Sequence, residues 1–133
     1  MNNNLATMQR GIAVVRIITG ILLMYHGWEV FMPEKMKMYA GWFVERKYPM
    51  PEFWAYAGKT AELVAGIGFV LGFFVRLSAF VSIVAFAGII FMLGGKGKIF
   101  TDDQHPFLFI LLSLVFLFTG YSALGVDGIR KKR

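Results

Sequence analysis

The sequence contains no cysteine, which excludes disulfides, thiolate metal ligands and any persulfide or dithiol chemistry carried by this chain. Histidine is nearly as scarce: His26 and His105 are the only two, they belong to different segments, and with the nearby acidic residues they fit no standard metal-ligand spacing. No phosphate loop, dinucleotide fingerprint or Ser-His-Asp arrangement is present. The sequence therefore predicts no metal site and gives no evident cofactor site.

Charged residues are also sparse, and apolar residues are correspondingly frequent. Charged residues make up 17% of the 133 residues and hydrophobic residues 57%, whereas soluble domains have about 45–50%. The mean hydropathy is +0.61. A chain of this length forms one domain, and in water it would expose a large fraction of these residues. We expect residues 1–133 to form a single transmembrane domain in contact with the lipid bilayer.

Four apolar segments are each close to the roughly 20 residues that a helix needs to cross a bilayer. They do not alternate polar and apolar residues, as the strands of a membrane barrel would, and helices satisfy their backbone groups internally. The sequence predicts an all-α, integral membrane four-helix bundle. Its helices span about residues 11–31, 53–74, 77–93 and 106–124.

The connections add detail to this bundle. The first, residues 32–52, has apolar residues at helical spacing with lysines and arginines around them, which predicts a short interfacial helix, the alternative being an irregular loop. These residues are Met36, Tyr39, Ala40 and Phe43. A very short turn at Val75 and Arg76 joins the second and third helices, so the two form an antiparallel hairpin. Gly58 and Gly66, spaced around Glu62, favour close packing of the second helix, which we expect to be central.

The formal charge of +6 does not indicate a nucleic acid partner. The basic residues flank the apolar segments, a pattern typical of topology signals and of contact with anionic lipid, and no basic stripe with stacking aromatics is present. Lysines and arginines are equally numerous on the two sides of the membrane. The dense basic cluster at residues 130–133 favours a cytoplasmic location for both termini.

Charged side chains inside the bilayer cost about 2.5–3.5 kcal/mol each, so they normally face protein or a water-filled cavity. Lys59 and Glu62 lie one turn apart on the second helix and are able to pair. His26 and Glu29 have the same spacing near the outer end of the first helix. Because the two helices are antiparallel, all four side chains are expected to meet in a polar pocket between these helices, toward the outer leaflet.

Arg16 lies nearer the inner surface, where it would snorkel or reach Glu62 or Asp127. Each of these candidates also has a purely structural interpretation. Lys59, Glu62 and Glu29 would then hold helices together, Arg16 would be a packing residue, and His26 a plain interfacial histidine. An aromatic belt explains the nearby tryptophans and tyrosines without any ligand.

Several motifs follow one another along the chain: Arg16 with Gly20, His26-Gly27-Trp28-Glu29, residues 61–66 and residues 120–127. In this order they resemble the DoxX family of four-helix bacterial membrane proteins, over about residues 10–128. The positions that match the family are Arg16, Gly20, Glu62, Gly66, Gly72, Arg76 and Asp127. The sequence departs from the family at the outer end of the first helix and at the start of the fourth.

The resemblance implies a bacterial inner (cytoplasmic) membrane protein with both termini cytoplasmic. It also implies a link to redox chemistry, since similar members are named for a subunit of thiosulfate:quinone oxidoreductase. Our preferred hypothesis is a redox-associated subunit that binds a quinone or similar lipid, with Glu62 and His26 handling protons and Lys59 or Arg16 balancing charge. Electrons would then come from a redox protein partner.

Two alternatives remain open. The chain could be a non-catalytic membrane anchor or assembly partner, with residues 32–52 and the basic tail as its contact surfaces. It could also be a small-solute or proton transport component, if Arg16, Glu62 and His26 line one path. The sequence does not decide whether the chain is an enzyme or whether it forms a homo-oligomer.

Overall fold

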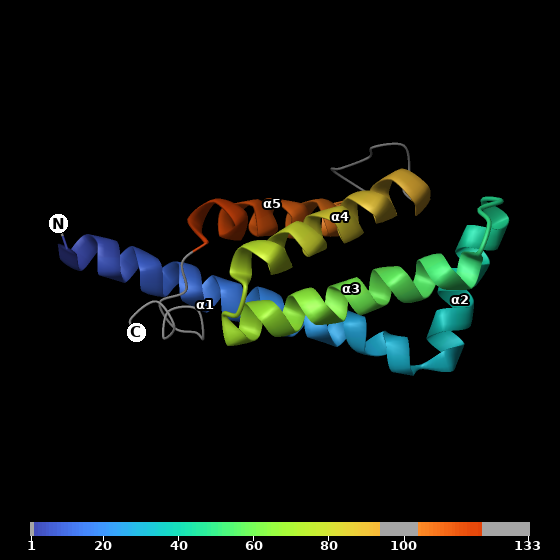
Figure 1. The fold of residues 1–133 in the computed structure, drawn as a ribbon, viewed down its shortest axis with the longest axis horizontal. Helices are drawn as coiled ribbons and strands as arrows, with labels where there is room; N and C mark the ends of the chain where they lie inside the picture. The colour runs from blue at the N-terminus through green and yellow to red at the C-terminus, as the bar shows by residue number, and fades with distance from the viewer. Residues whose placement is uncertain (1, 94–103, 121–133) are drawn as a thin grey trace.

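The structure, a computed structural model, describes residues 2–93 and 104–120, and every regular element in these two ranges is helical. Four helices run lengthwise and one shorter helix lies across an end (Figure 1). The elements in chain order are α1 (Asn2–Gly27), the 3₁₀ turn η1 (Trp28–Phe31), α2 (Pro33–Glu45), α3 (Pro51–Leu71), α4 (Val75–Leu93) and α5 (Gln104–Thr119).

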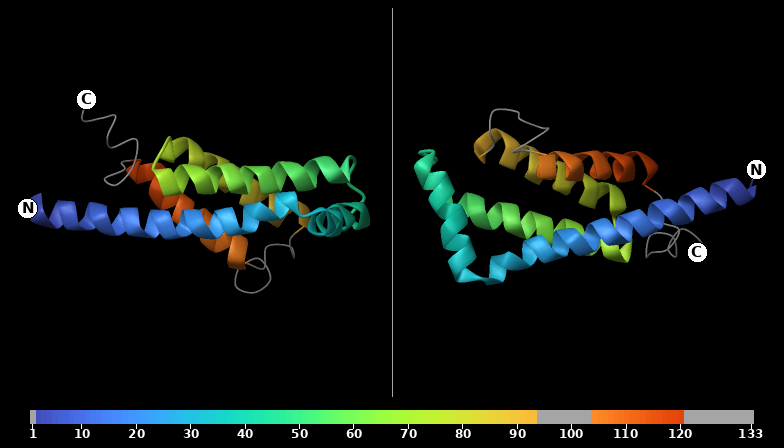
Figure 2. Two further views of the ribbon diagram at one scale, coloured as in Figure 1. Left: turned by 90° about the horizontal axis from the view of Figure 1, so that it is seen from below. Right: turned by 180° about the vertical axis from the view of Figure 1, so that it is seen from behind.

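The long helices form two pairs. α1 packs against α3 and α4 packs against α5, while α3 joins the pairs through its contact with α4. Figure 2 shows the same pairing from two further sides, with α2 crossing the end where α1 stops and α3 starts. The second predicted helix, which is α3, thus contacts α1, α2 and α4, as expected of a central helix.

Several predicted boundaries were wrong. The first helix starts at Asn2, well before residue 11, because no proline or glycine interrupts residues 2–10. Its predicted end at residue 31 is confirmed, since the 3₁₀ turn η1 continues α1 to Phe31. The turn between the second and third helices lies at residues 72–74, and Val75 and Arg76 belong to α4. The reason is Gly72, which caps α3 in the left-handed conformation (φ +65°) that an L side chain disfavours.

α5 begins at Gln104, so Pro106 lies in its first turn, and residues 121–124 of the predicted span lie outside the described residues.

The short helix predicted in the first connection is confirmed as α2. Pro33 at its first position suits a helix start, since proline lacks only an N–H that would have no intrahelical partner. Its apolar face, with Met36, Ala40 and Phe43 buried, packs against Ala55 of α3. This contact holds α2 over the end of the bundle.

The outer surface of the long helices is strongly apolar. Phe91, Phe118 and Leu77 are 85%, 77% and 60% exposed, and Ile21 of α1 is 55% exposed. Asn3–Phe31 and Val75–Met92 are long and apolar enough to cross a membrane, while Pro106–Thr119 is apolar but shorter. Apolar surface of this extent is typical of helices surrounded by lipid.

Candidate functional site

The centre of the site is an ion pair on α3. Lys59 and Glu62 lie one turn apart, and the Lys59 Nζ is 3.3 Å from a carboxylate oxygen of Glu62. This pairing was predicted from the spacing and is confirmed. The Glu62 side chain is only 3% exposed, so its charge depends on Lys59 for compensation rather than on water.

Glu29, in the 3₁₀ turn η1 that follows α1, contacts the same lysine. Its carboxylate lies 3.1 Å from the Lys59 Nζ, so one ammonium group faces two carboxylates. Gly27 makes this approach possible, because a Cβ at that position would lie 2.5 Å from the backbone nitrogen of Leu63. The Glu29 side chain is 20% exposed, Lys59 12% and Glu62 3%, so the three groups lead from the surface to the interior.

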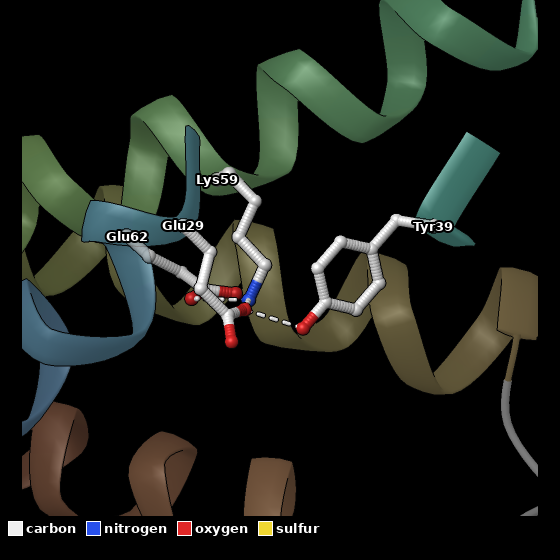
Figure 3. A network of polar contacts seen from close by, with 4 residues as sticks. All are labelled: Glu29, Tyr39, Lys59 and Glu62. Atoms are coloured by element: carbon white, nitrogen blue, oxygen red, sulfur yellow. Dashed lines mark hydrogen bonds and ion pairs between the residues drawn. The ribbon is translucent and has the colours of Figure 1, made fainter. Parts of the chain in front are cut away.

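Tyr39 of α2 completes the group, a role that the sequence did not indicate. Its hydroxyl donates a hydrogen bond to Glu29, and its ring centroid lies 4.5 Å from the Lys59 Nζ, which is a cation–π distance. Figure 3 shows the four side chains converging from three elements. Burial raises the pKa of Tyr39 and the bond to Glu29 raises it further, so the phenol is a neutral donor at neutral pH. We call Glu29, Tyr39, Lys59 and Glu62 the Lys59 network.

A cavity of about 370 Å³ lies beside this network. Lys59, Glu62 and His26 form its polar part, and most of the remaining wall is aromatic. His26 packs edge-on against Phe109 at 6.2 Å between ring centroids, and Phe109 stacks on Phe86 at 4.9 Å. The other aromatic residues that line the cavity are Tyr39, Trp42, Phe43 and Trp54. The site therefore presents flat apolar surfaces and, on one side, groups that donate and accept protons.

The cavity does not lie between the first two long helices, where the sequence placed it. There α1 and α3 are in close contact: a Cβ on Gly20 would lie 2.7 Å from the carbonyl oxygen of Gly66. The cavity lies where α3 faces α4 and α5, under α2, and His26 is the one residue of α1 in its lining. Glycines allow two backbones to touch, so the space is left on another face of α3.

Arg16 is not part of this site. It is 1% exposed, which rules out snorkelling, and its Nε donates a 2.8 Å hydrogen bond to the carbonyl oxygen of Phe69. Phe69 lies in the last turn of α3, where carbonyls have no intrahelical partner, and a cation is favourable there. This contact lies about two helical turns, roughly 10 Å, beyond Glu62. Asp127, its other expected partner, lies outside the described residues.

The other residues chosen by resemblance lie mainly at packing positions. Gly20 and Gly66 meet where α1 crosses α3, and Gly72 ends α3. The side chain of Arg76 packs over Gly120, where a Cβ would lie 2.1 Å from the arginine Nε. Of the family-matched residues that the structure describes, Glu62 is the one that lines the cavity.

Within residues 2–93 and 104–120, no group of three or more histidine, aspartate or glutamate side chains could hold a metal ion. In comparisons with known proteins, the model of the DoxX family matches residues 11–95, which is more than half of the chain. No curated protein and no solved structure matches the chain.

Proposed function

This chain belongs to the DoxX family, and we propose that it is a redox-associated membrane subunit that binds the head group of a quinone-type lipid in the cavity beside the Lys59 network. The observation that carries the proposal is the cavity itself. It combines aromatic walls with a buried carboxylate, an ammonium group and an imidazole on one side. Its volume of about 370 Å³ lies within the range of small-molecule sites, about 300–1,000 Å³.

The lining fits the chemistry of a quinone. A quinone ring is flat and apolar, with carbonyl oxygens that accept hydrogen bonds, and Phe86 and Phe109 supply a stacked aromatic wall. The Lys59 ammonium and the His26 imidazole are donors on the polar side. Reduction to the quinol takes up two electrons and two protons. The electrons would come from a redox protein partner, and the protons from Glu62 and His26 acting as general acids.

The Lys59 network suits the supply of those protons. Side-chain exposure falls from Glu29 through Lys59 to Glu62, so these three polar groups would connect the surface with the cavity. When all three are ionised, two carboxylates share one ammonium group, so proton uptake removes an excess of negative charge from an apolar region. Tyr39 holds Glu29 in place at the outer end of this connection.

We further propose that α1, α3, α4 and α5 all cross a bacterial cytoplasmic membrane. α2 would lie at the outer interface, with its apolar face on the bundle and its lysines toward the polar head groups. The start of α1 and the end of α5 would then both face the cytoplasm. In this orientation the cavity lies in the outer half of the membrane.

The test is mass spectrometry of lipids extracted after gentle detergent purification. Wild type, Glu62→Gln and Glu52→Gln are compared; Glu52 is an exposed carboxylate in the first turn of the same helix, so it is a matched control. We expect near-stoichiometric quinone in wild type and in Glu52→Gln, and about a tenfold or larger loss in Glu62→Gln. This variant loses the charge-assisted contact that holds the Lys59 ammonium in the cavity wall as a donor to the quinone, and a contact of that kind is worth about 1.5–3 kcal/mol.

Quinone no more abundant than in an unrelated membrane protein would contradict the proposal. A role in anchoring or assembling another membrane protein would then be the better explanation of the apolar exterior and of the α2 cap. Equal quinone in wild type and a well-folded Glu62→Gln variant would show that the lipid binds outside this cavity.

A further inference from the structure

A second cavity of about 350 Å³ lies between α3 and α4. It shares four lining residues with the first, Phe43, Trp54, Gly58 and Ile89, so the two cavities adjoin each other. The second part has no charged residue in its lining. We call it the tail groove.

Small residues create the tail groove. α3 and α4 are in close contact near their connecting turn, where a Cβ on Gly68 would lie 1.9 Å from the hydroxyl oxygen of Ser78, and they diverge toward α2 (Figure 1). Further along, a Cβ on Gly58 of α3 or on Gly88 of α4 would meet nothing within 4 Å. Both glycines line the groove, so its width depends on missing side chains.

The outer rim of the groove is apolar and exposed. Phe80 and Val84 of α4 line it and are 57% and 54% exposed, on the same face as the apolar surface that we assign to lipid. A hydrocarbon chain leaving the cavity beside Glu62 would therefore meet an uncharged and almost entirely apolar surface on its way to the bilayer. The groove is closed toward the α3–α4 turn, so it suits a single chain better than the full length of another helix.

From this adjacency and the apolar lining of the tail groove we infer that the groove holds the hydrocarbon tail of the lipid whose head group occupies the cavity. The inference rests on the proposed function and narrows it: the ligand is an amphiphilic quinone with a long tail, admitted sideways from the membrane between α3 and α4. A water-soluble quinone would occupy only the first cavity, beside the Lys59 network, which we call the head-group cavity. Trp54, which lines both parts, lies where head group and tail join.

The test compares two probes in purified protein, a dimethoxy-methyl-benzoquinone without a tail and the same ring with a decyl chain. Binding is followed by quenching of tryptophan fluorescence, since Trp42 and Trp54 line the head-group cavity. Gly88→Leu fills the groove without touching the polar site. The matched control is Gly41→Leu, because Gly41 also has open space around its Cβ but lines neither cavity.

We expect Gly88→Leu to weaken binding of the decyl probe about tenfold or more, through overpacking of the groove, and the tail-less probe by less than about twofold. Gly41→Leu should leave both affinities as in wild type. If Gly88→Leu does not fold, Ala61→Leu serves instead, since Ala61 lines the tail groove but not the cavity beside the Lys59 network.

Unchanged decyl-probe affinity in a folded groove variant would overturn the inference while the proposed function stands. A changed oligomeric state with both affinities unchanged would also overturn it, and would make the groove a protein contact. If neither probe binds wild type, the proposed function fails and this inference fails with it.

Discussion

At the scale of single residues, Lys59 organises the site. Its ammonium group contacts carboxylates from two elements and the ring of Tyr39 from a third. An isolated charge with so little exposure to solvent would be costly, and these contacts compensate it. The same contacts fix α2 and η1 against α3, so one network both stabilises the fold and places a carboxylate in the cavity wall.

Tyr39 gives a pH-dependent signature of this network. Because burial and the bond to Glu29 raise its pKa, its hydroxyl should ionise above the ordinary value of about 10. The stabilisation from the neutral phenol is therefore complete below that value and is lost as pH rises through the raised pKa. The phenolate absorbance of wild type minus that of Tyr39→Phe should show a midpoint above about 10.

The chain has five tyrosines, so the difference between the two titrations isolates Tyr39. Tyr56→Phe, at an exposed position on α3, controls for the loss of any one phenol. A difference midpoint at or below the ordinary value would mean that Tyr39 does not bind Glu29 in the membrane protein.

The residues of the site differed in how far the sequence could predict them. Lys59 and Glu62 pair because they lie on one helix at a fixed spacing, so the sequence contained that contact. The contact of Tyr39 with Glu29 and Lys59 was missed because it depends on how η1 turns α2 back over α3. The apolar pattern of the short helix had already explained Tyr39 as a packing residue. One partner of Arg16 is the backbone carbonyl of Phe69, which no side-chain pattern identifies.

At the scale of helices, the crossing of α1 and α3 decides where space remains for a ligand. Gly20 and Gly66 bring the two backbones together, and a Cβ on Gly66 would lie 2.8 Å from the carbonyl oxygen of Gly20. We predict that Gly66→Ala lowers the free energy of unfolding by about 1–3 kcal/mol, because backbone cannot yield as a flexible side chain can. Reversible unfolding in mixed micelles measures the change.

The control for this crossing is Gly11→Ala, on the same long helix as Gly20 but with nothing within 4 Å of an added Cβ. It should leave stability unchanged or raise it slightly, since alanine favours a helix. Equal effects of the two substitutions would contradict the close crossing. Small-residue spacing predicted that α3 is central, but it did not show which face of α3 stays open, so the pocket was assigned to the wrong side.

At the scale of the whole molecule, two helix pairs meet near the α3–α4 turn and diverge toward α2 (Figure 1). The space between them is covered at its end by α2, lined by aromatic rings and supplied with charge by the Lys59 network. The apolar segments, the short helix and the all-helical class were accessible from hydropathy and periodicity. The divergence of the pairs was not, because it results from contacts between helices distant in sequence.

The most direct test of the central claim is photolabelling of wild-type protein in membranes with an azido-quinone, followed by mass spectrometry of the labelled peptides. We predict labels in residues 54–62 of α3 and 106–109 of α5, suppressed by excess unlabelled quinone, since residues of both segments line the cavity. Labels confined to outward faces, such as those around Ile21 or Phe118, and unaffected by competitor, would contradict a quinone site beside Lys59 and Glu62.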